Sequence, residues 1–239
     1  MNFPSIKNKP EIGSVNEYLK QQLSDVRSEV ALAIENRSTA FSKNTVTLVA
    51  VSKRQPNEKI EAALAAGQRI FGENRVQEAD KRWSIRRNKY NDLILHLIGP
   101  LQTNKVSEAV ALFDVIEVVD REKLARILAK EMERQGRRLP CYIQVNTGEE
   151  PQKSGIMPNQ VESFTQFCIN DLALPIVGLM CIPPFDEEAA MHFALLNSMA
   201  KRLNLSHLSM GMSNDYREAI GFGATSVRVG SAIFGPREN

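Results

Sequence analysis

Lys53 is the residue whose position in this sequence offers the clearest chemistry. It follows the apolar run VTLVAVS, residues 46–52, so its stem should begin inside the core and its amine should emerge where the run ends. Burial disfavours the ammonium form and lowers the pKa of a lysine, which makes the neutral amine available as a nucleophile toward an aldehyde. A lysine that only extends its charge to solvent, or pairs at a strand end, is the alternative on spacing alone.

The segment 228–231, Arg-Val-Gly-Ser, offers an anion site. Gly230 lets the backbone approach an anion closely, and Ser231 supplies an N–H group and a hydroxyl. Ser209 and Gly211, one apolar run earlier, would complete a phosphate cradle. The alternative is ordinary turn chemistry beside a surface arginine. An amine together with such a cradle suits a phosphorylated aldehyde or ketone held as a Schiff base.

Two further polar residues lie where apolar runs end. His96 stands between leucines and is either a hydrogen-bonded core residue or a group that faces a ligand, whereas Asn74, in GENRVQE, fits a polar lining role. Other chemistries lack their residues: the sequence contains no GxSxG, no GxxxxGK[ST] and no His/Asp/Glu cluster with metal-ligand spacing. The lysine and the phosphate cradle therefore form the coherent arrangement in this chain.

Composition restricts the class of protein. The 239 residues are 43% hydrophobic, enough for a sizeable core, and 30 basic residues nearly balance 28 acidic ones. That balance argues against nucleic acid and membranes as partners. Three cysteines without a CxxC pair predict free thiols in a reducing compartment. The N-terminus has no apolar signal region and no run approaches ~18 apolar residues, so we expect a cytosolic protein.

Apolar β-branched runs alternate with helical periodicity along the chain, which predicts βαβ units and a parallel sheet. The expected strands are 46–52, 69–72, 93–98, 115–119, 141–145, 177–182, 207–210 and 226–229. The expected helices between and before them are 14–37, 57–66, 76–87, 104–112, 121–135, 160–169, 187–203 and 216–222. Eight such units predict a single (β/α)₈ TIM barrel, which binds ligands at the C-terminal ends of its strands. An open doubly wound sheet is the second possibility, although no GxGxxG follows the first strand.

The chain is expected to form one domain over 14–239, with residues 1–13 as a flexible segment. The extra N-terminal helix should be capped by Ser14, and its apolar residues recur at three- and four-residue steps through Leu19, Leu23 and Val26.

Seven segments of the chain have recognisable motifs. They are VAVSKRQP, FGENRVQEADKR, HLIGPLQTNK, QVNTGEEPQKSG, GLMCIPP, LSMGMSNDYREAI and GATSVRVGSAIFG. Together they resemble the YggS/PROSC family of pyridoxal 5′-phosphate (PLP) homeostasis proteins. They follow the family order across about residues 40–236, whereas the first 40 residues carry no signature. One departure is IEVVDRE after the fourth strand, where a serine is more usual before the second valine and where Glu117 adds a carboxylate near the mouth.

The resemblance implies an alanine racemase-like barrel (PLP fold type III) that carries PLP as an internal aldimine. It assigns the Schiff base to Lys53 and the pyridine nitrogen to Arg228. It further implies a phosphate site made by Ser209, Gly230 and Ser231, and a pocket lined by Asn74, His96 and Met210.

The resemblance also implies a role in intracellular PLP (vitamin B6) homeostasis without robust catalysis. Apo PLP-dependent enzymes are the expected recipients, and we expect a monomer. The related racemases add a C-terminal β-domain with a second catalytic base, and with Asn239 as the last residue we expect no such domain here. The alternatives are a PLP-dependent enzyme such as a weak amino-acid racemase, and a Schiff-base aldolase or isomerase that acts on sugar phosphates.

Overall fold

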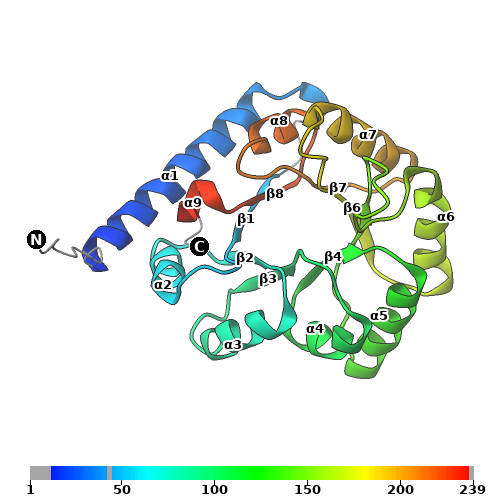
Figure 1. Ribbon diagram of the computed structural model, residues 1–239, viewed down its shortest axis with the longest axis horizontal. Helices are drawn as coiled ribbons and strands as arrows, with labels where there is room; N and C mark the ends of the chain where they lie inside the picture. Colours follow the sequence, from blue (N-terminus) through cyan, green and yellow to red (C-terminus); the bar gives the residue numbers. More distant parts are fainter. Residues whose placement is uncertain (1–11, 42–44, 237–239) are drawn as a thin grey trace, which may run out of the picture.

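Eight parallel strands close into a barrel (Figure 1). The computed structural model describes residues 12–41 and 45–236. The strands are β1 (Thr47–Val51), β2 (Ile70–Glu73), β3 (Ile94–Leu97), β4 (Val115–Val119), β5 (Cys141–Val145), β6 (Ile176–Cys181), β7 (His207–Ser209) and β8 (Ser226–Val229). Each strand pairs with the next, and β8 pairs with β1, so that Leu48 lies opposite Val227. The predicted (β/α)₈ barrel is confirmed, and the open doubly wound sheet is wrong because the first and last strands are hydrogen-bonded.

Helices surround the barrel on its outside (Figure 1). They are α1 (Ile12–Asn36), α2 (Asn57–Ala65), α3 (Val76–Arg87), α4 (Val106–Leu112), α5 (Glu122–Gln135), α6 (Val161–Gln166), α7 (Ala189–Arg202), α8 (Tyr216–Gly221) and α9 (Ser231–Phe234). The sequence did not predict α9, which begins one residue after Gly230. Helix α7 begins two residues later than expected, because Glu188 has extended backbone angles and occupies the N-cap position.

Helix α1 is amphipathic, as its periodicity predicts. Leu19, Leu23 and Val26 are buried, and the helix packs against α2, α8 and α9. The expected cap at Ser14 is wrong: α1 already begins at Ile12, because residues before a capping-type serine can also adopt helical angles. Of the expected flexible segment 1–13, residues 1–11 lie outside the described residues.

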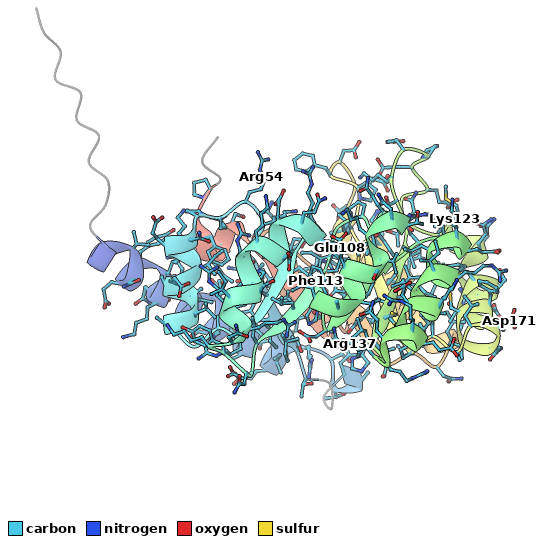
Figure 2. The ribbon with its side chains drawn as sticks, turned by 90° about the horizontal axis from the view of Figure 1, so that it is seen from below. Arg54, Glu108, Phe113, Lys123, Arg137 and Asp171 are labelled. Carbon is cyan, nitrogen blue, oxygen red and sulfur yellow. The ribbon has the colours of Figure 1, made fainter. Side chains whose placement is uncertain are left out.

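The two rims of the barrel differ in what they carry. Figure 2 shows Arg54 at the upper edge and Arg137 at the lower edge of the molecule. Arg54 follows the end of β1, whereas Arg137 precedes the start of β5, so the upper rim in this view holds the C-terminal ends of the strands. In a TIM barrel this rim carries the ligand site.

Two expectations from composition concern thiols and membranes. Cys141, Cys168 and Cys181 are buried and unpaired with one another, as predicted. Burial raises the pKa of all three thiols, which keeps them protonated and unreactive. Within the described ranges, every helix is too short or too polar to cross a bilayer.

Candidate functional site

A cavity of about 770 Å³ opens at the C-terminal ends of the strands. Its wall combines residues at the C-terminal ends of β1, β2, β3, β5, β6, β7 and β8, which the barrel brings to one rim although they are far apart in the sequence. Five of the eight predicted site residues lie in this wall, namely Lys53, Asn74, Arg228, Gly230 and Ser231.

The loop that carries Lys53 is fixed from below by an arginine of α3. Lys53 is half-buried in the cavity wall, and the next residue, Arg54, has a left-handed backbone with φ of 59°. Arg82 donates hydrogen bonds to the carbonyl oxygens of Ser52, at 2.9 Å, and of Gln55, at 3.0 Å. Because these carbonyls flank the lysine on both sides, Arg82 determines where the β1–α2 loop lies.

Arg82 is itself held by a buried carboxylate. Glu73, at the end of β2, is fully buried, and its Oε1 accepts a hydrogen bond from Arg82 Nη1 at 2.7 Å. The same oxygen accepts from the Ser52 hydroxyl at 2.7 Å and from the Trp83 indole N–H at 3.0 Å. Three donors from β1 and α3 therefore converge on one oxygen below the lysine loop.

Asn74 presents an unsatisfied acceptor at the cavity. Its Oδ1 is buried and has no hydrogen-bond partner among the described residues. Gly99 packs so closely on Asn74 that a Cβ there would lie 2.5 Å from the Asn74 carbonyl oxygen and 2.6 Å from its Cα. A buried acceptor without a partner is costly, so a ligand that donates a hydrogen bond would stabilise this wall.

Replacement of Gly99 by alanine should displace Asn74. The new methyl group would overlap backbone rather than the end of a side chain, so we expect the free energy of unfolding to fall by ~1–3 kcal/mol. Denaturant unfolding measures this loss. Gly221→Ala is the matched control, because a Cβ at Gly221 meets no atom within 4 Å and should leave stability within about 1 kcal/mol of the wild type. Equal stability of both variants would contradict the close packing at Gly99.

Backbone N–H groups and hydroxyls gather where β8 passes into α9. Ser213 Oγ accepts hydrogen bonds from the N–H groups of Gly230, at 3.1 Å, and of Ala232, at 3.3 Å. Ser213, Gly230 and Ser231 all line the cavity. A Cβ at Gly230 would lie 3.4 Å from the Val51 Cβ, which is ordinary van der Waals contact, so the turn packs against the end of β1 without requiring a glycine. The two N–H groups hold Ser213 Oγ, so the hydroxyls of Ser213 and Ser231 are the donors that suit an oxyanion at this wall.

Sequence analysis missed Ser213. The segment LSMGMSND contains two serines four residues apart, and only the path of the loop shows which of them reaches the cavity. Ser209 is the last residue of β7 and is fully buried in the barrel interior, whereas Ser213 lies in the loop that rises above the strand. The phosphate contact expected of Ser209 is therefore not reproduced by the cavity wall.

His96 and Met210 are also absent from the described cavity wall. Both are buried, His96 within β3 and Met210 directly after β7. Residues of short barrel strands point alternately into the barrel and toward the helices, and interior side chains stack in layers below the rim. The structure thus places these two residues, with Ser209, under the cavity or behind its wall.

A polar network crosses the barrel interior beneath the cavity. Glu117 of β4 lies at its centre: His96 Nδ1 is 2.6 Å from Glu117 Oε1, and the Ser209 hydroxyl donates to Oε2 at 2.6 Å. Arg228 Nη1 donates to Ser209 Oγ at 2.5 Å, and its Nη2 donates to the Cys181 carbonyl oxygen at 2.7 Å. Arg228 therefore connects this network to the cavity that it lines.

The network keeps Glu117 ionised. Complete burial by itself raises the pKa of this carboxyl, but the hydrogen bond and charge of His96, the charge of Arg228 and the Ser209 hydrogen bond together outweigh burial and hold the pKa below its usual range. An ionised carboxylate only accepts hydrogen bonds, so His96 Nδ1 and the Ser209 hydroxyl must both donate. Ser209 then has its oxygen lone pairs left to accept from Arg228.

Comparison with known proteins first defines the class of barrel. The family model described as the alanine racemase N-terminal domain matches residues 33–238. Alanine racemase from Enterococcus faecalis has the same fold, with a TM-score of 0.63 and 15% identity, over 95% of this chain and 58% of the racemase chain. At that identity the likeness extends to the fold alone.

More similar relatives define the family. The pyridoxal phosphate homeostasis protein of Pasteurella multocida is 36% identical over 230 residues, which are 92% of this chain and 98% of that protein. Its counterpart in Pseudomonas aeruginosa is 40% identical over 220 residues, 88% of this chain and 94% of that protein. The solved structure of PipY from Synechococcus elongatus with PLP bound is 35% identical, with a TM-score of 0.78. The match covers 91% of this chain and 100% of the PipY chain. This chain belongs to the family of pyridoxal phosphate homeostasis proteins, which confirms the resemblance seen in its sequence.

Proposed function

We propose that this protein binds PLP on Lys53 and acts in intracellular PLP homeostasis. The observation that carries the proposal is that the lysine and a set of oxyanion donors open on the same cavity of about 770 Å³. The PLP that is bound to the related PipY structure and the names of the curated relatives support it. When bound, PLP supplies an aldehyde that reacts with amines and a pyridine ring that withdraws electrons.

The cavity wall has a suitable residue for each end of such a ligand. Lys53 provides the amine, and the orphaned Oδ1 of Asn74 provides an acceptor near it. We assign the phosphate to Ser213, Gly230 and Ser231 rather than to Ser209, because these three line the cavity. The hydroxyls of Ser213 and Ser231 donate to phosphate oxygens, and the N–H groups of Gly230 and Ala232 hold the Ser213 oxygen in place.

Arg228 is assigned to the pyridine nitrogen. A guanidinium is a permanent donor with no proton to give up at neutral pH, so it leaves that nitrogen unprotonated. An unprotonated ring withdraws electrons less strongly than one that faces a carboxylate. The arginine thus favours a protein that holds the cofactor over one that drives carbanion chemistry.

The cavity wall also gives little support to a two-base racemase. Racemisation needs an acid or base on each face of the substrate carbon. In the described part of the chain, the wall contains no tyrosine, histidine or cysteine. Its carboxylates are engaged elsewhere: Glu187 lies 3.2 Å from His192 Nε2, and Asp215 Oδ1 accepts from the Met212 N–H group at 2.5 Å.

Apo PLP-dependent enzymes are the proposed recipients, with the protein acting as a monomer in the cytosol. The test is PLP transfer from the loaded protein to an apo-enzyme, compared with free PLP at the same concentration. Faster or more complete reactivation by the loaded protein supports delivery. Reactivation that never exceeds the rate set by free PLP would overturn delivery. Light scattering of the loaded protein tests separately whether it is a monomer.

Replacement of Ser213 by alanine should weaken PLP binding. The change removes a hydroxyl from the cradle and the acceptor of two backbone N–H groups, so we expect the dissociation constant to rise roughly tenfold, the equivalent of one charge-assisted hydrogen bond. Equilibrium dialysis with PLP measures the change, and excess inorganic phosphate should compete less well with the ligand. Ser163→Ala on α6, whose hydroxyl donates to the Gln160 carbonyl, is the control. Identical affinities of the two variants would remove Ser213 from the phosphate site.

A further inference from the structure

The buried carboxylate of Glu117 has no part in the cofactor contacts assigned so far. We propose that Glu117 is a positioning residue for Arg228: it anchors the guanidinium through the Ser209 hydroxyl and so fixes the arginine that faces the cofactor ring. The inference rests on the proposed function, because it concerns how the ring-facing residue is held.

The directions of the hydrogen bonds support this anchoring. Since Glu117 accepts only, the Ser209 hydrogen points to Glu117 Oε2 at 2.6 Å, and the Ser209 oxygen can then only accept from Arg228 Nη1 at 2.5 Å. A glutamine in place of Glu117 could instead turn its amide N–H group toward the Ser209 oxygen and compete with Arg228 for it. The carboxylate therefore determines the polarity of the whole chain of hydrogen bonds.

The guanidinium of Arg228 is fixed at two of its three nitrogens. Nη1 bonds to Ser209 of β7, and Nη2 bonds to the Cys181 carbonyl of β6. Because the group is planar, two anchors on different strands define its plane, and three of its five N–H groups still have no partner among these contacts. Arg228 lines the cavity, so these remaining donors are the ones available to a ligand.

Charge compensation gives a second reason for a carboxylate at this position. The Arg228 side chain is 3% exposed and its Nη1 lies 3.9 Å from Glu117 Oε2. A buried guanidinium without a counter-charge is strongly disfavoured. Glu117 is also faced by His96 of β3 and lies near Tyr142 of β5, the pKa of which is raised by burial and by the charge of Glu117. In the described part of the chain, Glu117 is the carboxylate that pairs with Arg228.

Glu117→Gln tests the inference, because it keeps the shape of the side chain and removes its charge. We expect the PLP-loaded variant to retain Lys53 attachment, fixed by borohydride and located by mass spectrometry. We expect the absorbance band of the lysine-linked cofactor to change its pH profile, and retention of PLP in dialysis to fall roughly tenfold. Asp120→Asn is the matched control: Asp120 directly follows the same strand and is largely buried, but it pairs with Arg121.

The outcomes separate this inference from the proposed function. A wild-type protein that takes up no PLP overturns the proposed function itself. A Glu117→Gln protein with the pH profile and PLP retention of the wild type overturns the positioning role alone. Ser209→Ala provides an independent test if Glu117→Gln fails to fold: it should change the pH profile in the same direction, and an unchanged profile would also overturn the role. In the Glu117→Gln/Ser209→Ala double variant, a loss of PLP retention no larger than that of the more affected single variant supports action through Ser209. A loss equal to the sum of the two single losses contradicts it.

Discussion

Lys53→Ala protein should be colourless after incubation with PLP and gel filtration, whereas the wild-type protein should keep the visible band of the bound cofactor. Alanine removes the amine that attacks the PLP aldehyde, so the expected loss of covalent attachment is complete. The phosphate donors at Ser213 and Ser231 stay in place and should still give weak, reversible binding. The measurement is absorbance, followed by borohydride fixation and mass spectrometry of the digested protein.

Lys153→Ala is the control for that experiment, because Lys153 is a second lysine that lines the same cavity. Its Nζ lies 2.6 Å from Glu150 Oε2 in an ion pair. We expect this variant to retain the band and the cofactor on Lys53. Cofactor fixed on Lys153 in the Lys53→Ala protein would show that the cavity, and not one lysine, determines where PLP reacts.

Arg82→Ala should cause the largest loss of stability of these variants, about 3–5 kcal/mol in the free energy of unfolding. The replacement leaves the fully buried carboxylate of Glu73 without its counter-charge and releases the carbonyls of Ser52 and Gln55. Urea unfolding followed by circular dichroism measures the loss. Because the released loop carries Lys53, PLP attachment should also become slower.

Arg69→Ala provides the comparison for a solvent-exposed pair. Arg69 lies 3.0 Å from Asp92, whose side chain is 67% exposed, and its Nη1 also donates to the Leu64 and Gln68 carbonyl oxygens. Loss of the exposed pair and of these hydrogen bonds should reduce stability by about 1–2 kcal/mol. Similar losses in Arg69→Ala and Arg82→Ala would contradict the special role of the buried Glu73 pair.

The fold was largely predictable because the apolar pattern of the strands and their order along the chain determine a barrel. All eight strands were placed within one residue of their observed bounds at both ends, since apolar β-branched runs end where the barrel rim begins. Helix α9 could not be predicted, because four residues after a glycine show no periodicity. The start of α7 was missed because Glu187 and Glu188 are typical first-turn residues that here lie just before the helix.

The residues of the site could be predicted only from their positions near the ends of strands. Lys53 lies two residues after β1 and Arg228 is the last residue but one of β8, and both line the cavity. His96 and Ser209 also lie at strand ends, yet they point into the interior layer, where Glu117 joins them. A sequence pattern places the end of a strand only to within about one residue. Because side chains alternate in direction along a strand, a shift of one residue reverses whether a side chain points into the barrel or away from it.

The pairing of β1 with β8 has a consequence for how this chain is made. Thr47 and Ser226 are ladder partners, so the edge of β1 stays open while the ribosome synthesises all the intervening strands. At the usual rate of translation that interval is on the order of tens of seconds. The face of α1 that later packs on α8 and α9 is uncovered for the same period. A nascent chain with an open strand edge next to an uncovered apolar helix face is prone to aggregate. Closure of the barrel by β1 and β8 comes late and joins distant parts of the chain, so it is the folding step that competes most with association between chains.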